Sequence, residues 1–275
     1  AESHHADIDF AGSDRLFSEG YAQIADLLAK SLEIRLNDPV QNIDYSGDLV
    51  QITTENNQYQ ATYVLVTVPL GVLKHADIGF NPYLPQAKRK SIQQLEMGVL
   101  NKIYLEFDEV FWDKEAQSIA CLSPEHRIAR EMMNFYPLTK KPILMAFTAG
   151  VVGKQLEQLS DRELLALIMD SLKHMYGEDL PKLKSHCITR WASDEYSYGS
   201  YSYLPVGVKA KRRQRLGKPV DNKLFFAGEA TSFYFPSTVH GAFLSGVRSA
   251  YQILQIDLLT EDVRKRTAIV EDPYL

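Results

Sequence analysis

The stretch FFAGEATSFYFPSTVHGA, residues 225–242, places one carboxylate and several aromatic side chains between an apolar run and a helical pattern. The apolar run at 224–228 is typical of a buried strand, and residues 237–255 have the apolar spacing of a helix. A strand that leads into a helix in this way predicts a mixed α/β fold. We expect the helix to bury Val239, Ala242, Phe243, Gly246, Val247 and Ala250.

The junction between this strand and this helix carries groups that can bind a ligand. Glu229 follows Gly228 at the strand end, and Thr238 and Val239 lie in the first turn of the helix. A carboxylate accepts hydrogen bonds from hydroxyls, and the unpaired N–H groups of a first helical turn bind anions or carbonyl oxygens. This combination suits a nucleotide cofactor. The structural alternative, in which Glu229 caps the loop and the aromatics belong to the core, fits the spacing equally well.

Other segments have recognisable helix and strand patterns. The best-marked helix is 160–177, where Ser160 and Glu163 have capping-box spacing and Gly177 ends the pattern. Further elements are expected as a helix on Ile24, Leu27, Leu28 and Leu32, short strands within 33–71, a helix at 85–98 ending at Gly98, and strands at 99–107 and 142–150.

Composition excludes several classes of protein. The chain has 275 residues, 45% hydrophobic and 24% charged, which is ordinary for a globular protein. A net charge of -5 gives no electrostatic case for binding nucleic acid. The longest apolar run, 63–73, contains Thr67 and Pro69 and is too short to span a membrane. The two cysteines, Cys121 and Cys187, suit a reducing, cytoplasmic setting.

Several common catalytic motifs are missing from the sequence. It contains no G-x-G-x-x-G, no phosphate-binding P-loop, no G-x-S-x-G and no H-x-x-x-H, so we expect no metal site. The basic run KAKRRQR at 209–215 could bind phosphates, but in an acidic protein we favour a solvated loop. The start, AESHHADIDF, has neither an initiating Met nor a signal peptide, which indicates a cut inside a longer chain.

Four segments together resemble one family. They are LFFAGEATSFYFPSTVHGAFLSGVRSA (224–250), VLVTVPLGVLK (64–74), MGVLNKIYLEF (97–107) and RWASDEYSYGSYSY (190–203). In this order and spacing they closely resemble the flavin-dependent amine oxidases, with polyamine oxidases and histone lysine demethylases nearest. The resemblance runs from about residue 10 to about residue 255. It implies an FAD-linked fold of two interleaved domains.

The resemblance assigns FAD contacts to particular positions. Glu229 matches the family carboxylate at the ribityl and pyrophosphate region, and Thr238 and Val239 match the helix start against the flavin pyrimidine end. Val40 matches a backbone contact to adenine, and Thr67 to Pro69 match a turn that lines the cofactor. The last two assignments rest on short stretches that also occur as plain strand ends.

The resemblance also assigns catalytic residues. Lys102 matches the lysine that holds a water near flavin N5, although a lysine in a strand is otherwise most often exposed. Trp191 matches an aromatic near the flavin ring, and Tyr201 matches an aromatic wall facing the substrate amine. Other aromatics of this region, Tyr196, Tyr198 and Phe235, could complete a cage for an amine or could be ordinary core residues.

The reaction implied is oxidation of an aliphatic amine or polyamine C–N bond by hydride transfer to flavin N5. Its products are an aldehyde, a shorter amine and hydrogen peroxide. The alternatives are a related flavin oxidase or desaturase that acts on a non-amine substrate, and a truncated remnant that has no catalytic function.

One departure from the family pattern is large, because members bind FAD through an N-terminal βαβ unit with G-x-G-x-x-G that this chain lacks. The expected partner is therefore the missing N-terminal segment of the same protein, and activity of this chain alone is open. We expect 1–80 to belong to the FAD-binding domain, 81–190 to bind substrate, 191–256 to return to the FAD-binding domain, and 257–275 to form a tail.

Overall fold

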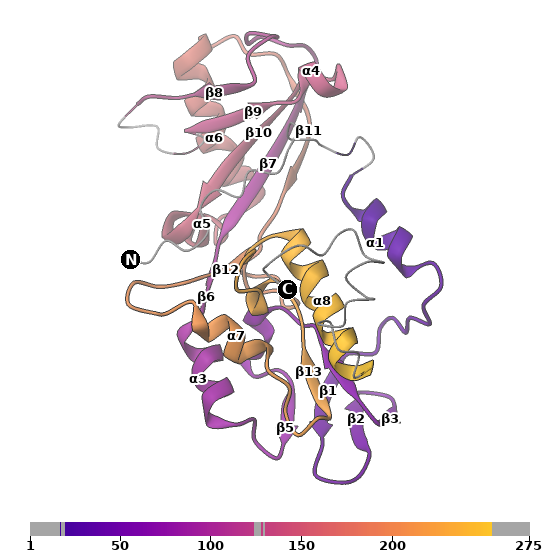
Figure 1. Ribbon diagram of the computed structural model, residues 1–275. Helices are drawn as coiled ribbons and strands as arrows, with labels where there is room; N and C mark the ends of the chain where they lie inside the picture. The colour runs from indigo at the N-terminus through magenta and orange to yellow at the C-terminus, as the bar shows by residue number, and fades with distance from the viewer. Residues whose placement is uncertain (1–16, 18–19, 124–127, 129, 255–275) are drawn as a thin grey trace, which may run out of the picture. The chain divides into compact units, whose positions relative to one another are not determined.

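The computed structural model describes residues 17, 20–123, 128 and 130–254, and the chain divides into two compact units. Unit 1 consists of Ala1–Met97 and Tyr201–Leu275, and unit 2 is Gly98–Ser200. Both units contain helices and strands, as Figure 1 shows, so the predicted mixed α/β fold is confirmed. The expected tail at 257–275 lies outside the described residues.

The described residues of unit 1 form three small sheets. The first has the order β3-β2-β1-β5, with antiparallel pairing except for the parallel pair β1 and β5. The second is a parallel pair of β13 and β4, and the third joins β12 to β6. The strand bounds are β1 Val40–Asp44, β2 Val50–Thr54, β3 Gln58–Ala61, β4 Val64–Val66, β5 Gly79–Asn81, β6 Glu96–Gly98, β12 Tyr201–Tyr203 and β13 Leu224–Phe226.

The helices of unit 1 are α1 Ala22–Ala29, α2 Leu70–His75, α3 Gln86–Gln94, α7 Lys211–Gly217 and α8 Val239–Leu254, with a 3₁₀ turn, η1, at Glu229–Thr231. In Figure 1, α3 and α7 lie side by side, although they are far apart in sequence. The expected helix near 24–32 is confirmed as the shorter α1. Its leucines Leu27 and Leu28 are exposed, so α1 buries no residue in the described structure.

The predicted end of the third helix at Gly98 is wrong. Helix α3 ends at Gln94, because Leu95 turns to an extended backbone and residues 96–98 form β6 opposite β12. The Nζ of Lys74 in α2 donates to the backbone oxygens of Gln93 at 3.1 Å and Leu95 at 2.7 Å. A lysine from another element therefore caps this helix end.

In the part of unit 2 that the structure describes, five antiparallel strands form one sheet, accompanied by helices. The strand order is β11-β7-β10-β9-β8, so β7 is paired on both sides. The bounds are β7 Leu100–Phe107, β8 Ser118–Ala120, β9 Glu131–Asn134, β10 Ile143–Ala149, β11 Leu183–Ile188, α4 Tyr136–Thr139, α5 Gly150–Leu156 and α6 Asp161–Tyr176. The expected strands at 99–107 and 142–150 are thereby confirmed.

Helix α6 covers one face of this sheet. Its Ile168 and Leu172 belong to the same buried cluster as Ile103 and Leu105 of β7. The predicted capping box is present, since the Ser160 hydroxyl accepts from the Glu163 N–H and the Glu163 carboxylate accepts from the Ser160 N–H. The opposite face of β7 carries Leu100, Lys102, Tyr104 and Glu106, all partly exposed.

The expected buried face of α8 is wrong. The buried residues of this helix are Gly241, Ser245 and Ser249, which are spaced four apart, whereas Val239 and Phe243 are about half exposed. Small side chains let the helix backbone approach the neighbouring loop closely. The Ser245 hydroxyl accepts from the Gly228 N–H at 2.8 Å, and the Ser249 hydroxyl donates to the Phe226 oxygen at 3.3 Å.

The basic run at 209–215 was expected to be a solvated loop, and this prediction is wrong. Residues 211–217 form α7, and the Arg213 side chain is only 2% exposed. Its guanidinium donates to the Ser202 hydroxyl at 2.5 Å and to the Ser202 carbonyl at 3.3 Å. A second buried basic side chain, Lys88 of α3, donates to the backbone oxygens of Leu216 and Lys218 at the end of α7.

The boundaries of the two units differ from the ones expected from sequence. Helix α3 and residues 96–97 of β6 fall in unit 1 and not with the segment 81–190, and residues 191–200 fall in unit 2. The assignment of FAD binding to one part and substrate binding to the other stays a prediction. No helix among the described residues has the length and apolar character needed to cross a membrane.

Candidate cofactor and amine site

The carboxyl ends of β4 and β13 bring two predicted segments together. Val66 pairs with Phe226 in the parallel register, and the Ala227 N–H donates to the Val66 oxygen at 3.1 Å. Thr67 and Gly228 therefore leave the sheet at the same edge, with Pro69 at the start of α2. In open α/β sheets, ligands bind at the carboxyl ends of parallel strands.

Gly228 leaves an open backbone surface at this edge. Its φ of +123° is a conformation that side chains rarely adopt, and nothing lies within 4 Å of the position that a Cβ would occupy. The absence of a side chain lets a ligand approach the main chain between β13 and η1. The sequence therefore places a glycine where its backbone conformation requires one.

The Glu229 carboxylate is held by the chain itself. Its Oε1 accepts from the Ser202 N–H at 2.9 Å, and its Oε2 accepts from the Ser202 hydroxyl at 2.7 Å and the Ser237 N–H at 2.7 Å. Arg213 lies 3.9 Å away. These contacts support the structural reading of Glu229 as a loop cap. A carboxylate offers about four acceptor positions, so one remains for an external donor, and the two readings are compatible.

The start of α8 is capped by Thr238. Its hydroxyl accepts from the Gly241 N–H at 3.0 Å and donates to the Phe235 oxygen at 2.9 Å. Val239, the next residue, is 51% exposed. The predicted helix start is thereby confirmed, and its first turn faces open space at Val239.

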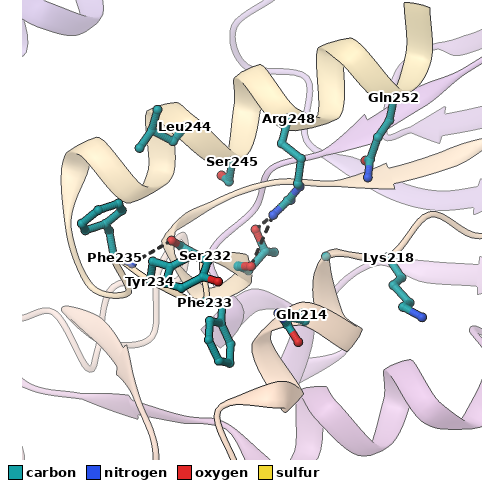
Figure 2. Close-up of a pocket in the computed structure, with 12 residues that line it drawn as sticks. Gln214, Lys218, Ser232, Phe233, Tyr234, Phe235, Leu244, Ser245, Arg248 and Gln252 are labelled. Atoms are coloured by element: carbon teal, nitrogen blue, oxygen red, sulfur yellow. Dashed lines mark hydrogen bonds between the residues drawn. The ribbon is translucent and has the colours of Figure 1, made fainter. Parts of the chain in front are cut away.

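A small cavity is lined by the loop 231–235 together with residues of α7 and α8, as Figure 2 shows. It has a volume of about 190 Å³. Arg248 reaches into it from α8 and donates to the Thr231 hydroxyl at 3.1 Å, while the Phe235 N–H donates to the Ser232 hydroxyl at 3.1 Å. Burial lowers the pKa of Arg248. This arginine also donates to the Phe226 oxygen at 2.7 Å, so it ties the loop to β13.

The remaining predicted cofactor residue of unit 1 is Val40. It lies in β1 opposite Thr54 and packs on the buried cluster that also contains Val66 and Phe226. The structure thus places both residues in unit 1, with Val40 in β1 and Glu229 in the turn η1. Its contact with adenine stays a prediction.

Lys102 and Trp191 are brought together in unit 2. The Lys102 N–H donates to the Thr189 hydroxyl at 2.8 Å, and the Thr189 N–H donates to the Lys102 oxygen at 3.0 Å. Trp191 follows two residues later and is 38% exposed. Lys102 lies on the face of β7 that α6 does not cover, with Phe147 of β10 directly opposite. These contacts place the backbone of Lys102, and its role at the flavin stays a prediction.

Sequence reasoning missed the two residues that hold the Trp191 segment. The Asn101 amide accepts from the Trp191 N–H at 2.9 Å and donates to Glu157 at 2.7 Å. The buried Glu157 carboxylate also accepts from the Ala192 and Ser193 N–H groups, at 2.9 and 2.8 Å. Burial alone would raise the pKa of Glu157, but these hydrogen bonds together lower it. The only signal in the sequence was the position of Asn101 next to Lys102.

We expect Glu157→Gln to loosen this segment, because an amide NH₂ would face the Ser193 donors. Unfolding free energy should fall by about 1–3 kcal/mol, and Trp191 emission should shift to the red in a Trp112→Phe background. The difference in unfolding free energy between the wild type and Glu157→Gln should disappear as the pH falls through the lowered pKa of Glu157. The exposed Glu178→Gln is the control, with a change within about 0.5 kcal/mol. Unchanged emission in Glu157→Gln would show that other contacts hold Trp191.

The predicted amine cage is divided between the units. Tyr201 lies in β12 and Phe235 in the loop before α8, both in unit 1, whereas Trp191, Tyr196 and Tyr198 belong to unit 2. Tyr196 is 68% exposed. The assembly of these side chains around an amine stays a prediction. Among the residues that the structure describes, no cluster of His, Cys, Asp or Glu could hold a metal ion.

Comparison with known proteins shows the family of the chain. A family model described as flavin containing amine oxidoreductase matches residues 1–254. Lysine-specific histone demethylase 1 homolog 3 of Arabidopsis thaliana is 38% identical over 261 residues, which cover 90% of this chain and 16% of that protein. Human lysine-specific histone demethylase 2 is 38% identical over 252 residues, with coverage of 89% and 31%. Polyamine oxidase 2 of Arabidopsis thaliana is 38% identical over 240 residues, with coverage of 87% and 48%.

Fold similarity agrees with this result. A putrescine oxidase redesigned in its cofactor binding superposes with a TM-score of 0.73 at 21% identity, covering 86% of this chain and 53% of that one. The chain spans less than half the length of each of the three sequence relatives above. The cofactor that membership implies is FAD. The chain belongs to the family of flavin-containing amine oxidoreductases.

Proposed function

We propose that this chain is the part of an FAD-dependent amine oxidase that holds one end of the cofactor and the substrate, with aliphatic amines or polyamines as substrates. The observation that carries the proposal is the carboxyl edge of β4 and β13, where Gly228, Glu229 and Thr67 meet in a chain of this family. Polyamine oxidase 2 is among the relatives, at 38% identity.

The residues at this edge fit part of an FAD molecule. The open backbone at Gly228 admits a ligand, the free acceptor position of Glu229 suits a hydroxyl, and the start of α8 suits a polar group. When bound, FAD would supply the acceptor for a hydride from the amine α-carbon. The glycine-rich loop that would hold the pyrophosphate is not in this sequence.

We therefore propose a segment with that loop as the partner of unit 1. Strands β4 and β13 form a parallel pair of three residues each, and Leu65 within β4 and Tyr63 just before it are 37% and 41% exposed. Parallel sheets are normally larger and covered on both faces. Additional strands and helices would complete this sheet and cover α1, Val239 and Phe243.

The residues of unit 2 would act on the substrate. A lysine at position 102 can hold a water and move a proton at its Nζ. An aromatic wall at Trp191 would disfavour the charged form of an amine, whose ordinary pKa is about 10.4. A neutral amine has the lone pair that assists loss of a hydride.

A methylated lysine side chain is the second candidate substrate. Relatives named lysine-specific histone demethylase are as similar to this chain as polyamine oxidase 2 is, at 38% identity. Both substrates present a C–N bond to be oxidised, so the shared chemistry does not distinguish them.

The proposal is tested on the full-length protein. We expect a flavin absorbance spectrum and peroxide release with spermine, spermidine or a dimethyl-lysine peptide. Bound flavin without peroxide from any amine would favour a related oxidase of a non-amine substrate. A folded protein without flavin would favour a remnant that has no catalytic function.

At the residue level, Lys102→Met should leave FAD bound and slow flavin reduction or reoxidation by about 10²-fold, as loss of a proton-transfer group does. Stopped-flow absorbance measures both half-reactions. Lys184→Met is the matched control, since Lys184 is an exposed lysine on the neighbouring strand β11 and pairs with Glu106 at 3.4 Å. Wild-type rates in both half-reactions of Lys102→Met would remove the residue-level argument for amine oxidation.

A further inference from the structure

A second and larger cavity lies elsewhere in unit 1. It has a volume of about 540 Å³ and is formed by α2, β5, α3 and the connections between them. None of its lining residues belongs to η1, α8 or the turn at Thr67. The cavity is therefore separate from the proposed cofactor site. Its size lies within the range of about 300–1,000 Å³ that is usual for sites of small organic ligands.

The walls of this cavity are mainly hydrocarbon. Leu73, Ile78 and Phe80 contribute partly buried side chains, and Leu84 and Ile92 are buried. All five pack on the main core cluster of unit 1, so the walls are anchored by the fold. A ligand that fills this space gains affinity by burying an apolar chain or ring.

Two cationic side chains line the cavity, but one of them is already neutralised. The Lys74 Nζ forms an ion pair with Glu96 at 3.1 Å and caps the end of α3, so its donors are used. The Arg89 Nε donates to the Leu84 oxygen at 2.9 Å. The terminal nitrogens of Arg89 have no hydrogen-bond or ion-pair partner among the residues that the structure describes. Arg89 is thus an exposed guanidinium, tied at Nε to the Leu84 oxygen, with free terminal donors at the edge of an apolar space.

From these contacts we propose that the cavity binds a small monocarboxylate with an apolar chain or ring. The apolar part lies against Phe80, Leu84 and Ile92, and the carboxylate pairs with the terminal nitrogens of Arg89. A guanidinium binds a carboxylate through two parallel hydrogen bonds, which fixes the orientation of the ligand. The bond from Nε to the Leu84 oxygen holds the guanidinium in place before the ligand arrives.

The test uses decanoate and decanol as probes, which have the same chain length and differ in charge. Titration calorimetry on this chain, below micelle formation, should show saturable binding of one decanoate and at least 10-fold weaker binding of decanol. Arg89→Glu should weaken the binding of decanoate at least 10-fold and leave the binding of decanol unchanged. Lys90→Glu, the same charge change at an exposed neighbour that does not line the cavity, should leave both unchanged.

A second variant tests the location. Gln93 is an exposed residue of α3 that lines the cavity, so Gln93→Trp should fill the space and weaken both probes at least 10-fold. Equal losses in Arg89→Glu and Lys90→Glu would overturn the proposal, and so would the absence of saturable binding to the wild-type chain. Undiminished decanoate binding by a folded Gln93→Trp variant would assign the probe to another apolar surface, such as that at Tyr63 and Leu65. The comparison of Arg89→Glu with Lys90→Glu decides the result even if the Gln93→Trp variant does not fold.

Discussion

Replacing Gly241 by alanine should strongly destabilise unit 1. A Cβ at this position would lie 1.8 Å from the Phe235 oxygen and 2.9 Å from the Thr238 hydroxyl, distances that real Cβ atoms do not show. Either α8 or the loop before it must move, and both the Thr238 cap and the hydrogen bonds at Glu229 depend on that geometry. We expect a loss of about 3 kcal/mol. This corresponds to a melting temperature lower by roughly 6–12 °C.

The control lies in the same helix. Gly246 has open space around the position of a Cβ, so Gly246→Ala should raise stability by up to about 1 kcal/mol through helix propensity. Thermal unfolding followed by circular dichroism compares the two variants. If Gly241→Ala were as stable as Gly246→Ala, the first turn of α8 would not be seated on the loop as described.

The second large effect is a pH dependence that originates at Lys88. Its side chain is 3% exposed and lies 3.6 Å from the Phe226 ring centre. Contacts with this ring and with two backbone oxygens favour the ammonium form. Burial, with a smaller contribution from the charge of Arg248, prevails and lowers the pKa of Lys88 from 10.5 to about 7.

The sign of the effect follows from proton binding. Between pH 7 and 10.5 the unfolded chain holds a proton on Lys88 that the folded chain has released, so stability rises with pH across this window. We expect this lysine to contribute an increase of about 2 kcal/mol between pH 7 and 9. The neutral amine keeps two N–H donors for the oxygens of Leu216 and Lys218.

Urea unfolding at pH 6, 7, 8 and 9 measures this dependence. In Lys88→Met the increase should be absent, whereas Lys90→Met, at an exposed position of the same helix, should keep the wild-type slope. Identical slopes in both variants would mean that the ring and the two oxygens hold Lys88 charged in the folded state.

Elements whose limits are set by neighbouring residues were predicted well from the sequence. Helix α6 is the clearest case, because Ser160, Glu163 and Gly177 supply its caps within a few positions. The end of α3 was missed because it depends on Lys74 from another helix and on the pairing of β6 with β12. The pattern of apolar residues within 85–98 contains no sign of those contacts.

The buried face of α8 was missed for a related reason. Hydrophobicity favoured Val239 and Phe243, but the helix packs through Gly241, Ser245 and Ser249 because it lies close to the backbone of the preceding loop. Close approach selects small residues, and an apolar pattern does not show where a backbone approaches.

The part of the candidate site that one continuous segment forms was predicted from the sequence. The strand, Glu229 and the Thr238 helix start came from residues 225–242 alone. The support of Trp191 by Asn101 and Glu157 could not be predicted, because these residues are distant in sequence and meet only when β7 and α5 fold.

The interruption of unit 1 by unit 2 has a consequence for the order of folding during synthesis. The chain leaves and returns at adjacent points, where the Ser200 N–H donates to the Gly98 oxygen at 2.8 Å. Unit 2 is one continuous segment and can fold as soon as it emerges from the ribosome. Strand β4 must wait for β13, which is made only after the whole of unit 2. Until then Val64 and Leu65 form an unpaired apolar edge, the kind of surface on which nascent chains aggregate or recruit chaperones.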